Sequence, residues 1–497
     1  MTILASGAVA LRSLRKLNVP VIRGPRGHGK VGQSMSPSRS LHRVRRTASA
    51  ALLCAAVAVA GGGARADGPQ PASPAATTVD RAGAELGAGA EAPRSLSLDE
   101  AVALARTRDF DVLLAAASVR GAEAEVRVAG QPPNPTISGG PSRRVDCFAS
   151  RCSAPWGAFG ALSDEGLVEG ALTGKRRLRQ DVAKRALEAA RFGRSNVERV
   201  VVAQVKMQYI QAAAARARVE LAREVDASLE RSVEINRVRY PRVIDEGQLA
   251  RVEQEAMRAQ QEVDSALRQQ RQEEIDLSIL LGASGPIPDI VVDRKALDFR
   301  VPAELATLDR ASLLRAAMAT RADRKQAAAQ VAQAEAAASL AARRRIPDVS
   351  LLAQYQQLGS GDTAPQPPTV SVGLGLPLPL FYQQQGEIAR AEADRQMALL
   401  GQRRLEALVA ADIESAVNAF ATARRIVERY EAALLERARR ARDITQVQFN
   451  AGSATLTDLL DAQRSYVQVN RGYYAELVTY WTAVFMLEQA VGKELVR

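Results

Sequence analysis

The sequence predicts a mainly α-helical protein with a small β part, in which one helix–strand–strand–long helix–helix unit occurs twice. Four observations lead to this fold class. The chain contains long segments without proline, such as Glu387 to Val447, and short sequence features recur after about 210 residues. Between the helical segments, short stretches alternate apolar with small or polar residues, which is typical of strands. Of the 497 residues 47% are hydrophobic but only 4% aromatic, which favours closely packed helices over a large aromatic core.

The first 66 residues are expected to be an N-terminal extension and secretory signal peptide. A basic segment at 43–46 precedes an apolar run at 48–60 and an A-x-A sequence that ends at Ala66. This order is typical of an exported protein that is cleaved after Ala66. The apolar run is shorter than the ~20 residues that a transmembrane helix needs. Residues 67–93, rich in Ala, Gly and Pro, are expected to form a flexible leader.

The positive charge of the chain lies in this N-terminal segment, whichever of Met1 and Met35 is the true start. Residues 1–66 hold 11 of the 67 Lys and Arg and none of the 55 Asp and Glu, so the remainder carries 56 basic and 55 acidic residues. The formal net charge of +12 therefore does not indicate a nucleic-acid partner. Both histidines, His28 and His42, also precede Ala66. Their position excludes imidazole catalysis and His-ligated metal sites from the exported part, so we expect no enzyme, no cofactor and no metal site.

The exported chain divides into two similar halves. We place the first repeat at 94–282, a connector at 283–307 and the second repeat at 308–497. Corresponding features follow in the same order in both halves: Leu98 and Leu308, Pro135 and Pro347, Gly174 and Gly386, Gly247 and Gly452, and Gly282 and Gly492. This order at nearly constant spacing predicts a duplicated unit.

Each half is expected to contain a very long helix. The first runs from Lys175 to Tyr240 and is ended by Pro241, because proline breaks a helix. The second spans Glu387 to Val447, and ~60 residues at 1.5 Å each give a length of ~90 Å. Its apolar residues follow a heptad spacing, which predicts coiled-coil packing; they are Leu405, Val409, Ile413, Ala416, Phe420, Ala423, Val427, Tyr430 and Leu434.

Two strand pairs are expected, one in each half. Residues 349–356 and 370–376 alternate apolar with small or polar side chains, as a strand between lipid and water does. An ordinary half-buried strand gives the same pattern. The first-half pair, at about 134–140 and 166–172, is less regular because Glu169 interrupts its apolar face. Four strands cannot close a barrel and an open edge cannot lie in lipid, whereas three chains supply 3 × 4 = 12 strands.

Two cysteines, Cys147 and Cys152, remain after the signal peptide. They are five residues apart in a loop-like stretch, and in an oxidising compartment such a pair predicts a local disulfide. A metal site would need two further ligands, which the stretch does not supply.

In these features the chain resembles the TolC-like outer-membrane efflux proteins. The resemblance covers almost all of 94–497 and is carried by ordered segments: LSLDEAVALA, NPTIS, TGKRR, LPLPLFYQQQGEIARAEA, FNAGSATLTDLLDAQRSYVQ and LEQAVG. It implies a homotrimer with a shared 12-strand outer-membrane β-barrel, continued by a periplasmic α-helical coiled-coil barrel. It also implies a periplasmic adaptor and an inner-membrane RND pump as partners, with outer-membrane lipid around the barrel. PLPLF followed by Gly386 is most similar to the branch that serves heavy-metal pumps.

The resemblance further implies an acidic aperture at the periplasmic tip. Glu253 and Asp458 each lie six residues after a hairpin glycine, Gly247 and Gly452, and Asp461 follows one turn later. A ring of carboxylates around a narrow water-filled mouth favours cations.

Two observations complicate this aperture. Asp458 is also the fourth residue of a Thr455-x-x-Asp capping box, a role compatible with lining the aperture. Phe449 and Ala454 stand where the family's best-known pattern has Tyr and Arg, whose polar links lock the closed mouth. Those links cannot form here, so closure of the mouth depends on packing or on other residues.

The expected function is a passive exit duct of a tripartite efflux system, for metal ions or small toxic compounds passing from periplasm to exterior. Its location would be the cell outer membrane, with a long periplasmic extension. One alternative is the outer-membrane duct of a type I secretion system. Another is a secreted coiled-coil structural or adaptor protein that spans the periplasm.

Overall fold

The computed structural model describes residues 94–142, 157–164, 173–242, 244–305, 309–358 and 367–495, all within one compact unit that spans Ala76–Arg497. Each repeat begins with a pair of helices rather than the expected single helix. The first repeat has α2 (Leu98–Arg108) and α3 (Phe110–Gly130), and the second has α7 (Arg310–Thr320) and α8 (Ala322–Arg343). Helix α7 begins at Arg310 because Asp309 is its N-cap and accepts hydrogen bonds from the amides of Ala311 and Ser312.

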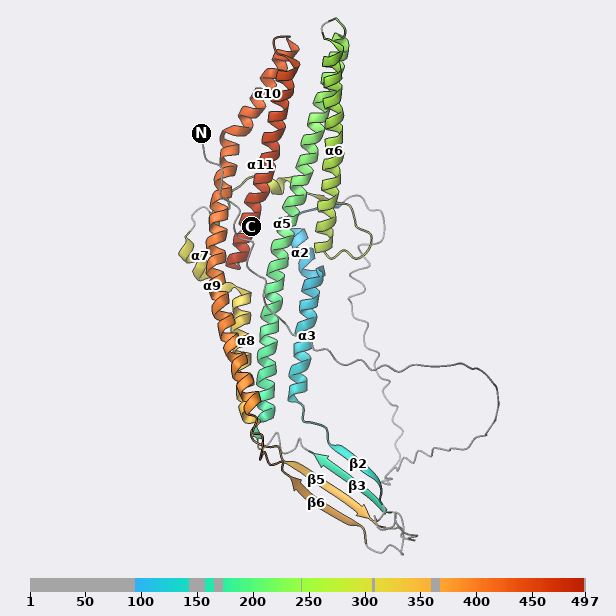
Figure 1. The fold of residues 1–497 in the computed structure, drawn as a ribbon, viewed down its shortest axis with the longest axis vertical. Helices are drawn as coiled ribbons and strands as arrows, with labels where there is room; N and C mark the ends of the chain where they lie inside the picture. The colour runs from blue at the N-terminus through green and yellow to red at the C-terminus, as the bar shows by residue number, and fades with distance from the viewer. Residues whose placement is uncertain are drawn as a thin grey trace, which may run out of the picture. The chain divides into compact units, whose positions relative to one another are not determined.

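The two predicted long helices are confirmed. Helix α5 (Lys175–Arg239) has 65 residues, which corresponds to about 97 Å, and it is followed by α6 (Glu246–Leu280). The second repeat has α9 (Gln385–Arg429), a π-helical turn at Tyr430–Leu434, α10 (Leu435–Asn450) and α11 (Leu456–Val491). Figure 1 shows α5 with α6, and α10 with α11, as two helical hairpins.

The heptad stripe on α9 is confirmed up to the π-helical turn. Val409, Ile413, Phe420 and Val427 are buried, but Leu434 is 42% exposed, so its predicted place in the stripe is wrong. A π turn holds one residue more than an α turn, and this extra residue shifts the stripe by one position. Beyond the turn the more enclosed positions are Leu435, Ala438, Arg442, Thr445 and Phe449.

The main core lies where the connector packs against the long helices of both repeats. Tyr209 on α5 and Tyr480 and Trp481 on α11 are fully buried there, with Phe420 of α9. The Tyr209 hydroxyl donates to the carbonyl oxygen of Leu96 (2.6 Å) and accepts from the Asp293 amide (2.9 Å), so it satisfies two backbone groups of the surrounding loops.

A short parallel strand pair belongs to the same region and was not predicted. Strand β1 (Arg94–Leu96) pairs with β4 (Ile290–Val292) of the connector. The connector also contains the 3-10 turns η3 (Arg294–Leu297) and η4 (Ala303–Leu305). The start of the first repeat is thereby fixed to the segment that joins the two repeats.

The larger sheet has four antiparallel strands in the order β2-β3-β5-β6. Strands β5 (Ser350–Gln357) and β6 (Thr369–Gly375) confirm the second-half pair, and β2 (Thr136–Ser142) agrees with the prediction for its segment. The fourth strand is β3 (Gly157–Asp164), which pairs with both β2 and β5. The range predicted for it, 166–172, lies outside the described residues, and the prediction is corrected. Gly157, Gly160 and the alanines of β3 dilute the apolar alternation that sequence analysis relies on.

None of the helices in the described part of the chain combines the length and apolar character needed to cross a bilayer.

Candidate functional site

The sheet carries one apolar face that is open to the surroundings. Residues directly opposite each other in antiparallel strands lie on the same face. The strand register places on one face Ile137, Leu162, Leu351, Ala353, Tyr355, Val370, Val372 and Leu374, with Asp164 opposite Leu351 at one end of the sheet. Ile137 is 84% exposed and Val372 is 73% exposed. The opposite face carries small and polar side chains such as Ser138, Gln354 and Ser371, together with Phe159 and Leu352.

The first hairpin tip contains Glu253, which is held by an arginine of the same hairpin. Asp245 is the N-cap of α6 and accepts from the Gln248 amide at 2.7 Å, which fixes the start of the helix. Glu253 lies two turns further along α6, and Arg237 of α5 donates to its carboxylate at 2.9 Å. The charge of Glu253 is therefore compensated within its own hairpin.

The second hairpin tip contains Asp458 in a complete capping box. The Asp458 amide donates to the Thr455 hydroxyl, and the Asp458 carboxylate accepts from the Thr455 hydroxyl (2.6 Å) and amide (3.0 Å). These hydrogen bonds lower the pKa of Asp458 below its ordinary value, so the carboxylate is ionised at neutral pH. The capping role of Asp458 is thus confirmed, and the carboxylate remains exposed.

The third carboxylate, Asp461, belongs to a chain of charges between the two hairpins. Arg464 contacts Asp461 at 3.4 Å and also bridges to Glu255 of α6. Glu255 accepts in addition from Arg258 at 3.0 Å. The tip carboxylates on α6 and α11 are therefore interleaved with arginines.

Phe449 does not line an open surface in this structure. It is buried, and the guanidinium of Arg239 lies 5.2 Å from its ring centroid. The same guanidinium donates to the carbonyl oxygens of Phe449 (3.5 Å) and Asn450 (2.9 Å) at the end of α10. The last carbonyls of a helix are electronegative and not all paired inside it, so an arginine is well placed there, although the Phe449 carbonyl also accepts from the Gly452 amide at 3.0 Å.

Sequence analysis missed this contact between the hairpins. Arg239 at the end of α5 forms a polar link between the two hairpin tips. The sequence predicted no such link there, because Phe449 and Ala454 replace the Tyr and Arg of the family's best-known pattern. The adjacent Pro241 was the available signal, since it placed Arg239 at a helix end. A second link lies further from the tip, where Arg442 of α10 bridges to Glu224 of α5 (2.9 Å) and lies over the ring of Tyr466.

The comparisons with known proteins agree with this architecture. Residues 313–493 match the family model described as outer membrane efflux protein. The pyoverdine export outer membrane protein OpmQ of Pseudomonas putida is 28% identical over 396 residues, which cover 75% of this chain and 81% of that protein. The chain is therefore similar to outer membrane efflux proteins, over residues 313–493 by the family model and over most of its length by OpmQ.

Solved structures at lower identity share the fold of this efflux protein. CusC has a TM-score of 0.65 at 15% identity, over 86% of this chain and 99% of CusC. The CmeC outer membrane channel of Campylobacter jejuni has a TM-score of 0.65 at 17% identity, over 80% of this chain and 85% of that channel. These solved structures show the fold alone. Together with the family match over residues 313–493 and the similarity to OpmQ, whose family members are channels and not enzymes, the fold supports a location in the cell outer membrane with a helical periplasmic extension. The alternative of a secreted structural protein is wrong.

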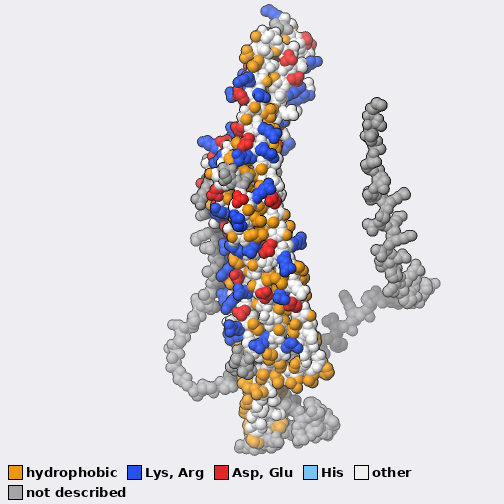
Figure 2. Space-filling view, turned by 90° about the vertical axis from the view of Figure 1, so that its left-hand side faces the viewer, with side chains coloured by type: hydrophobic (Ala, Val, Ile, Leu, Met, Phe, Trp, Pro, Cys, Tyr) orange, Lys and Arg blue, Asp and Glu red, His pale blue; other side chains and the backbone are white. Residues whose placement is uncertain are grey.

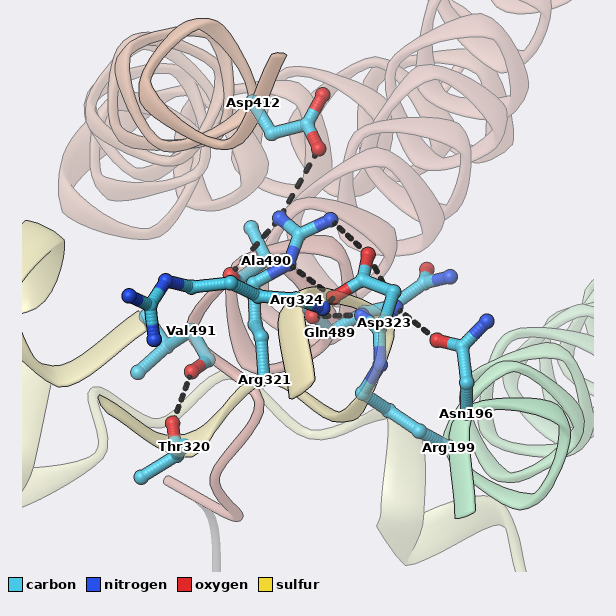
Figure 3. Close-up of polar contacts among 10 residues, drawn as sticks. All are labelled: Asn196, Arg199, Thr320, Arg321, Asp323, Arg324, Asp412, Gln489, Ala490 and Val491. Atoms are coloured by element: carbon cyan, nitrogen blue, oxygen red, sulfur yellow. Dashed lines mark hydrogen bonds and ion pairs between the residues drawn. The ribbon is translucent and has the colours of Figure 1, made fainter. Parts of the chain in front are cut away.

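The junction between α7 and α8 of the efflux protein holds a buried charge cluster that sequence analysis did not find (Figure 3). Arg321 donates to Asp323 (2.7 Å), to Asp412 of α9 (3.0 Å) and to the carbonyl oxygen of Ala490 on α11 (3.2 Å). Arg199 of α5 adds a contact to Asp323 at 3.4 Å. Four helices therefore meet at one set of charges.

Burial and ion pairing oppose each other in this cluster. Burial raises the pKa of Asp323, but the hydrogen bonds and charge of Arg321, with the charge of Arg199, outweigh it and hold that pKa below its usual value. Burial lowers the pKa of Arg321, and the hydrogen bonds to Asp323 and Asp412 raise it overall. Both partners are therefore charged at neutral pH.

A buried ion pair connects the two repeats close to this cluster. Lys206 on α5 lies 2.8 Å from Glu488 on α11, and both side chains are 8% exposed. Glu488 also accepts from the Leu495 amide at 2.8 Å.

The remaining candidate residues and sites can be placed briefly. Cys147 and Cys152 lie outside the described residues. In the part of the chain that is described, no group of three or more His, Cys, Asp or Glu is arranged to hold a metal ion.

Proposed function

We propose that three copies of this efflux protein share one 12-strand barrel in the outer membrane, continued by an α-helical coiled-coil barrel in the periplasm. The observation that supports this proposal is the four-stranded sheet, whose faces are largely exposed and whose edge strands β2 and β6 each pair on one side only among the described residues. Unpaired backbone groups at such an edge cost several kcal/mol each in lipid. Three sheets joined edge to edge remove every open edge, and the apolar face then contacts lipid.

The resulting channel is the passive exit duct of a tripartite efflux system. A periplasmic adaptor and an inner-membrane RND pump supply the energy, and metal ions or small toxic compounds leave through the duct. The relative named for pyoverdine export supports a small molecule as cargo. The duct itself contributes conduction and gating.

The periplasmic aperture is formed by the tip carboxylates Glu253, Asp458 and Asp461, with Phe449 packed behind them. Ionised carboxylates around a narrow mouth attract cations and bind divalent ones. Arg239 and Arg464 connect the two hairpins of each protomer at this level. Block of single-channel current by divalent cations measures the role of these carboxylates.

Cysteines at the two open edges of the sheet test the shared barrel. Ser138 on β2 and Ser371 on β6 lie in one cross-strand row and on the same polar face. In a background with Cys147→Ser and Cys152→Ser, Ser138→Cys is combined with a cysteine at position 369, 371 or 373, because strands of a barrel are staggered. Oxidation in outer-membrane vesicles is expected to give covalent dimers and trimers for at least one pair.

The control combines Ser138→Cys with Gln354→Cys, because β5 lies inside the sheet and cannot meet an edge of another copy. Monomers from every pair in the scan would show that the sheet edges of neighbouring copies do not meet.

A further inference from the structure

The segment between β6 and α9 exposes a run of large apolar side chains. Leu376, Leu378, Leu380, Phe381 and Tyr382 are all exposed, and Phe381 is 99% exposed. Pro377 and Pro379 alternate with the leucines and stiffen the backbone. Contiguous exposed apolar side chains of this size mark a contact with a partner or a membrane.

Arginines whose side chains form no hydrogen bond or ion pair within the described part of the chain lie next to this apolar segment. Arg343, Arg344 and Arg345 follow one another at the end of α8, and Arg177 lies in the first turn of α5. All four side chains are exposed, and none makes a hydrogen bond or ion pair with another described residue. Lys175 of α5 forms an ion pair with Asp348, just beyond α8, at 2.8 Å. This contact places the start of α5, with Arg177, beside the end of α8, with Arg343–Arg345.

The carboxylates at this level are already engaged. Asp348 accepts from Lys175, and Glu387 accepts from the Tyr382 hydroxyl at 2.5 Å. That hydrogen bond lowers the pKa of Glu387 below its ordinary value, and the charge of Arg344 contributes to the same shift. The junction therefore has an excess of positive charge directly beside apolar side chains. Figure 2 shows apolar side chains gathered at the lower end of the helical part, with Lys and Arg directly above them.

We propose that this junction, defined as Arg177, Arg343–Arg345 and Leu376–Tyr382, binds the headgroups of anionic phospholipids in the periplasm-facing leaflet of the outer membrane. The proposal rests on the proposed barrel, which places the strand–helix boundary at the membrane surface. The arginines bind the phosphates, because a guanidinium matches phosphate with paired hydrogen bonds. The leucines and Phe381 lie at the boundary of the acyl chains, where aromatic side chains are enriched.

An amphiphilic ligand explains the junction better than the other occupants. Free phosphate makes no use of the adjacent apolar side chains. A second copy of the chain would bring its own arginines to the same level, and like charges repel when no carboxylate is available to pair with them. A phospholipid supplies both the negative charge and the apolar surface.

Lipid retention by the intact protein tests the arginines. The variant Arg343→Gln/Arg344→Gln/Arg345→Gln is compared with Arg437→Gln/Arg439→Gln/Arg440→Gln, which neutralises three exposed arginines on α10. After reconstitution with phosphatidylglycerol and mild extraction, native mass spectrometry counts the bound lipids. We expect the junction variant to retain at least about fivefold less phosphatidylglycerol than wild type, with unchanged channel conductance, and the control to retain the wild-type amount.

Three outcomes would overturn the proposal: equal lipid retention in both variants, loss of the oligomer in place of lipid from the junction variant, or displacement of phosphatidylglycerol by millimolar inorganic phosphate. A wild-type protein that neither inserts nor conducts would instead refute the proposed function, so the two failures are distinguishable.

Fluorescence quenching tests the apolar part of the junction separately. Phe381→Trp is expected to be quenched strongly by brominated acyl chains of phosphatidylglycerol, after subtraction of the wild-type signal. Ile444→Trp, at a 50% exposed position on α10, is expected to show no quenching. Equal quenching of the two tryptophans, or none at Phe381→Trp, would contradict contact with acyl chains.

Discussion

The two repeats interrupt their opening helix at the same place but stabilise the break differently. Asp109 and Arg321 are separated by 212 residues, the same offset that separates Gly174 from Gly386. In the first repeat, the Asp109 carboxylate accepts from the amides of Asp111 and Val112 and caps α3 locally. In the second repeat, Arg321 makes no side-chain cap and instead binds groups on α8, α9 and α11.

This difference shows which properties a duplication conserves. Both copies keep the backbone break, and both place a glycine with positive φ beside it, Gly282 (80°) and Gly492 (75°). The exchange of a carboxylate for a guanidinium turns a local helix cap into a connection among helices. Backbone geometry is therefore common to both copies, whereas the electrostatic role of the same position is not.

The largest expected effect separates these two roles. Arg321→Ala removes the shortest ion pair of Asp323 in a largely buried setting, leaves only the longer ion pair with Arg199, and takes one donor from the Ala490 carbonyl, so it should cost about 3–5 kcal/mol of stability. Asp109→Ala removes only a cap and should cost about 1 kcal/mol. Thermal unfolding of the detergent-solubilised protein, followed by circular dichroism, measures both. Arg324→Ala is the control, because this half-exposed arginine is 3.8 Å from Glu406. Equal losses for Arg321→Ala and Asp109→Ala would refute the distinction.

A smaller effect is expected at the paired glycines. Alanine at either position is strained by the positive φ, at a cost of about 1–2 kcal/mol. At Gly282 the added Cβ would also overlap the backbone carbonyl of Arg108, with its carbon at 2.7 Å, whereas at Gly492 the approach is less close, 3.1 Å to the Arg321 side chain and 3.3 Å to its Cα. Gly282→Ala should therefore lower the free energy of unfolding more than Gly492→Ala, by about a further 1–3 kcal/mol. A larger loss of stability for Gly492→Ala than for Gly282→Ala would show that the helix break at Arg321 accommodates an added methyl group less well than the break at Asp109.

The smallest effect concerns the tips. Asp458→Gln, which keeps the capping pattern, combined with Asp461→Asn should weaken divalent-cation block of single-channel current by roughly fivefold. Glu253→Gln should change it less, because Arg237 already compensates that charge at 2.9 Å. Planar-bilayer recordings with added Mg²⁺ measure the block. Unchanged block in the double variant would show that the carboxylates of the second hairpin tip do not contribute to divalent-cation binding in the aperture.

The long helices, the duplication and three of the four strands of the larger sheet followed from the sequence, because proline-free heptads and period-two alternation are strong local signals. The breaks at Asp109 and Arg321 were missed, since neither residue is a helix breaker and their stabilising contacts depend on the local backbone turn or on distant helices. The shift at Leu434 was missed because a π turn has no sequence signature. Among the tip residues, the capping box of Asp458 was predictable from four consecutive letters. The contact of Arg239 with Phe449 and Asn450 was not, because its partners are 210 residues away in the chain.

The π-helical turn at Tyr430–Leu434 has a consequence for how this protein can diversify. A one-residue insertion in a continuous coiled coil rotates everything beyond it by about 100°, yet here the hydrogen-bonded rod continues without a break. The direction in which the side chains of α10 point is thus set separately from that of the α9 residues that pack into the core. Gain or loss of a single codon at this turn would re-aim the surface offered to other proteins while leaving the rest of the channel untouched.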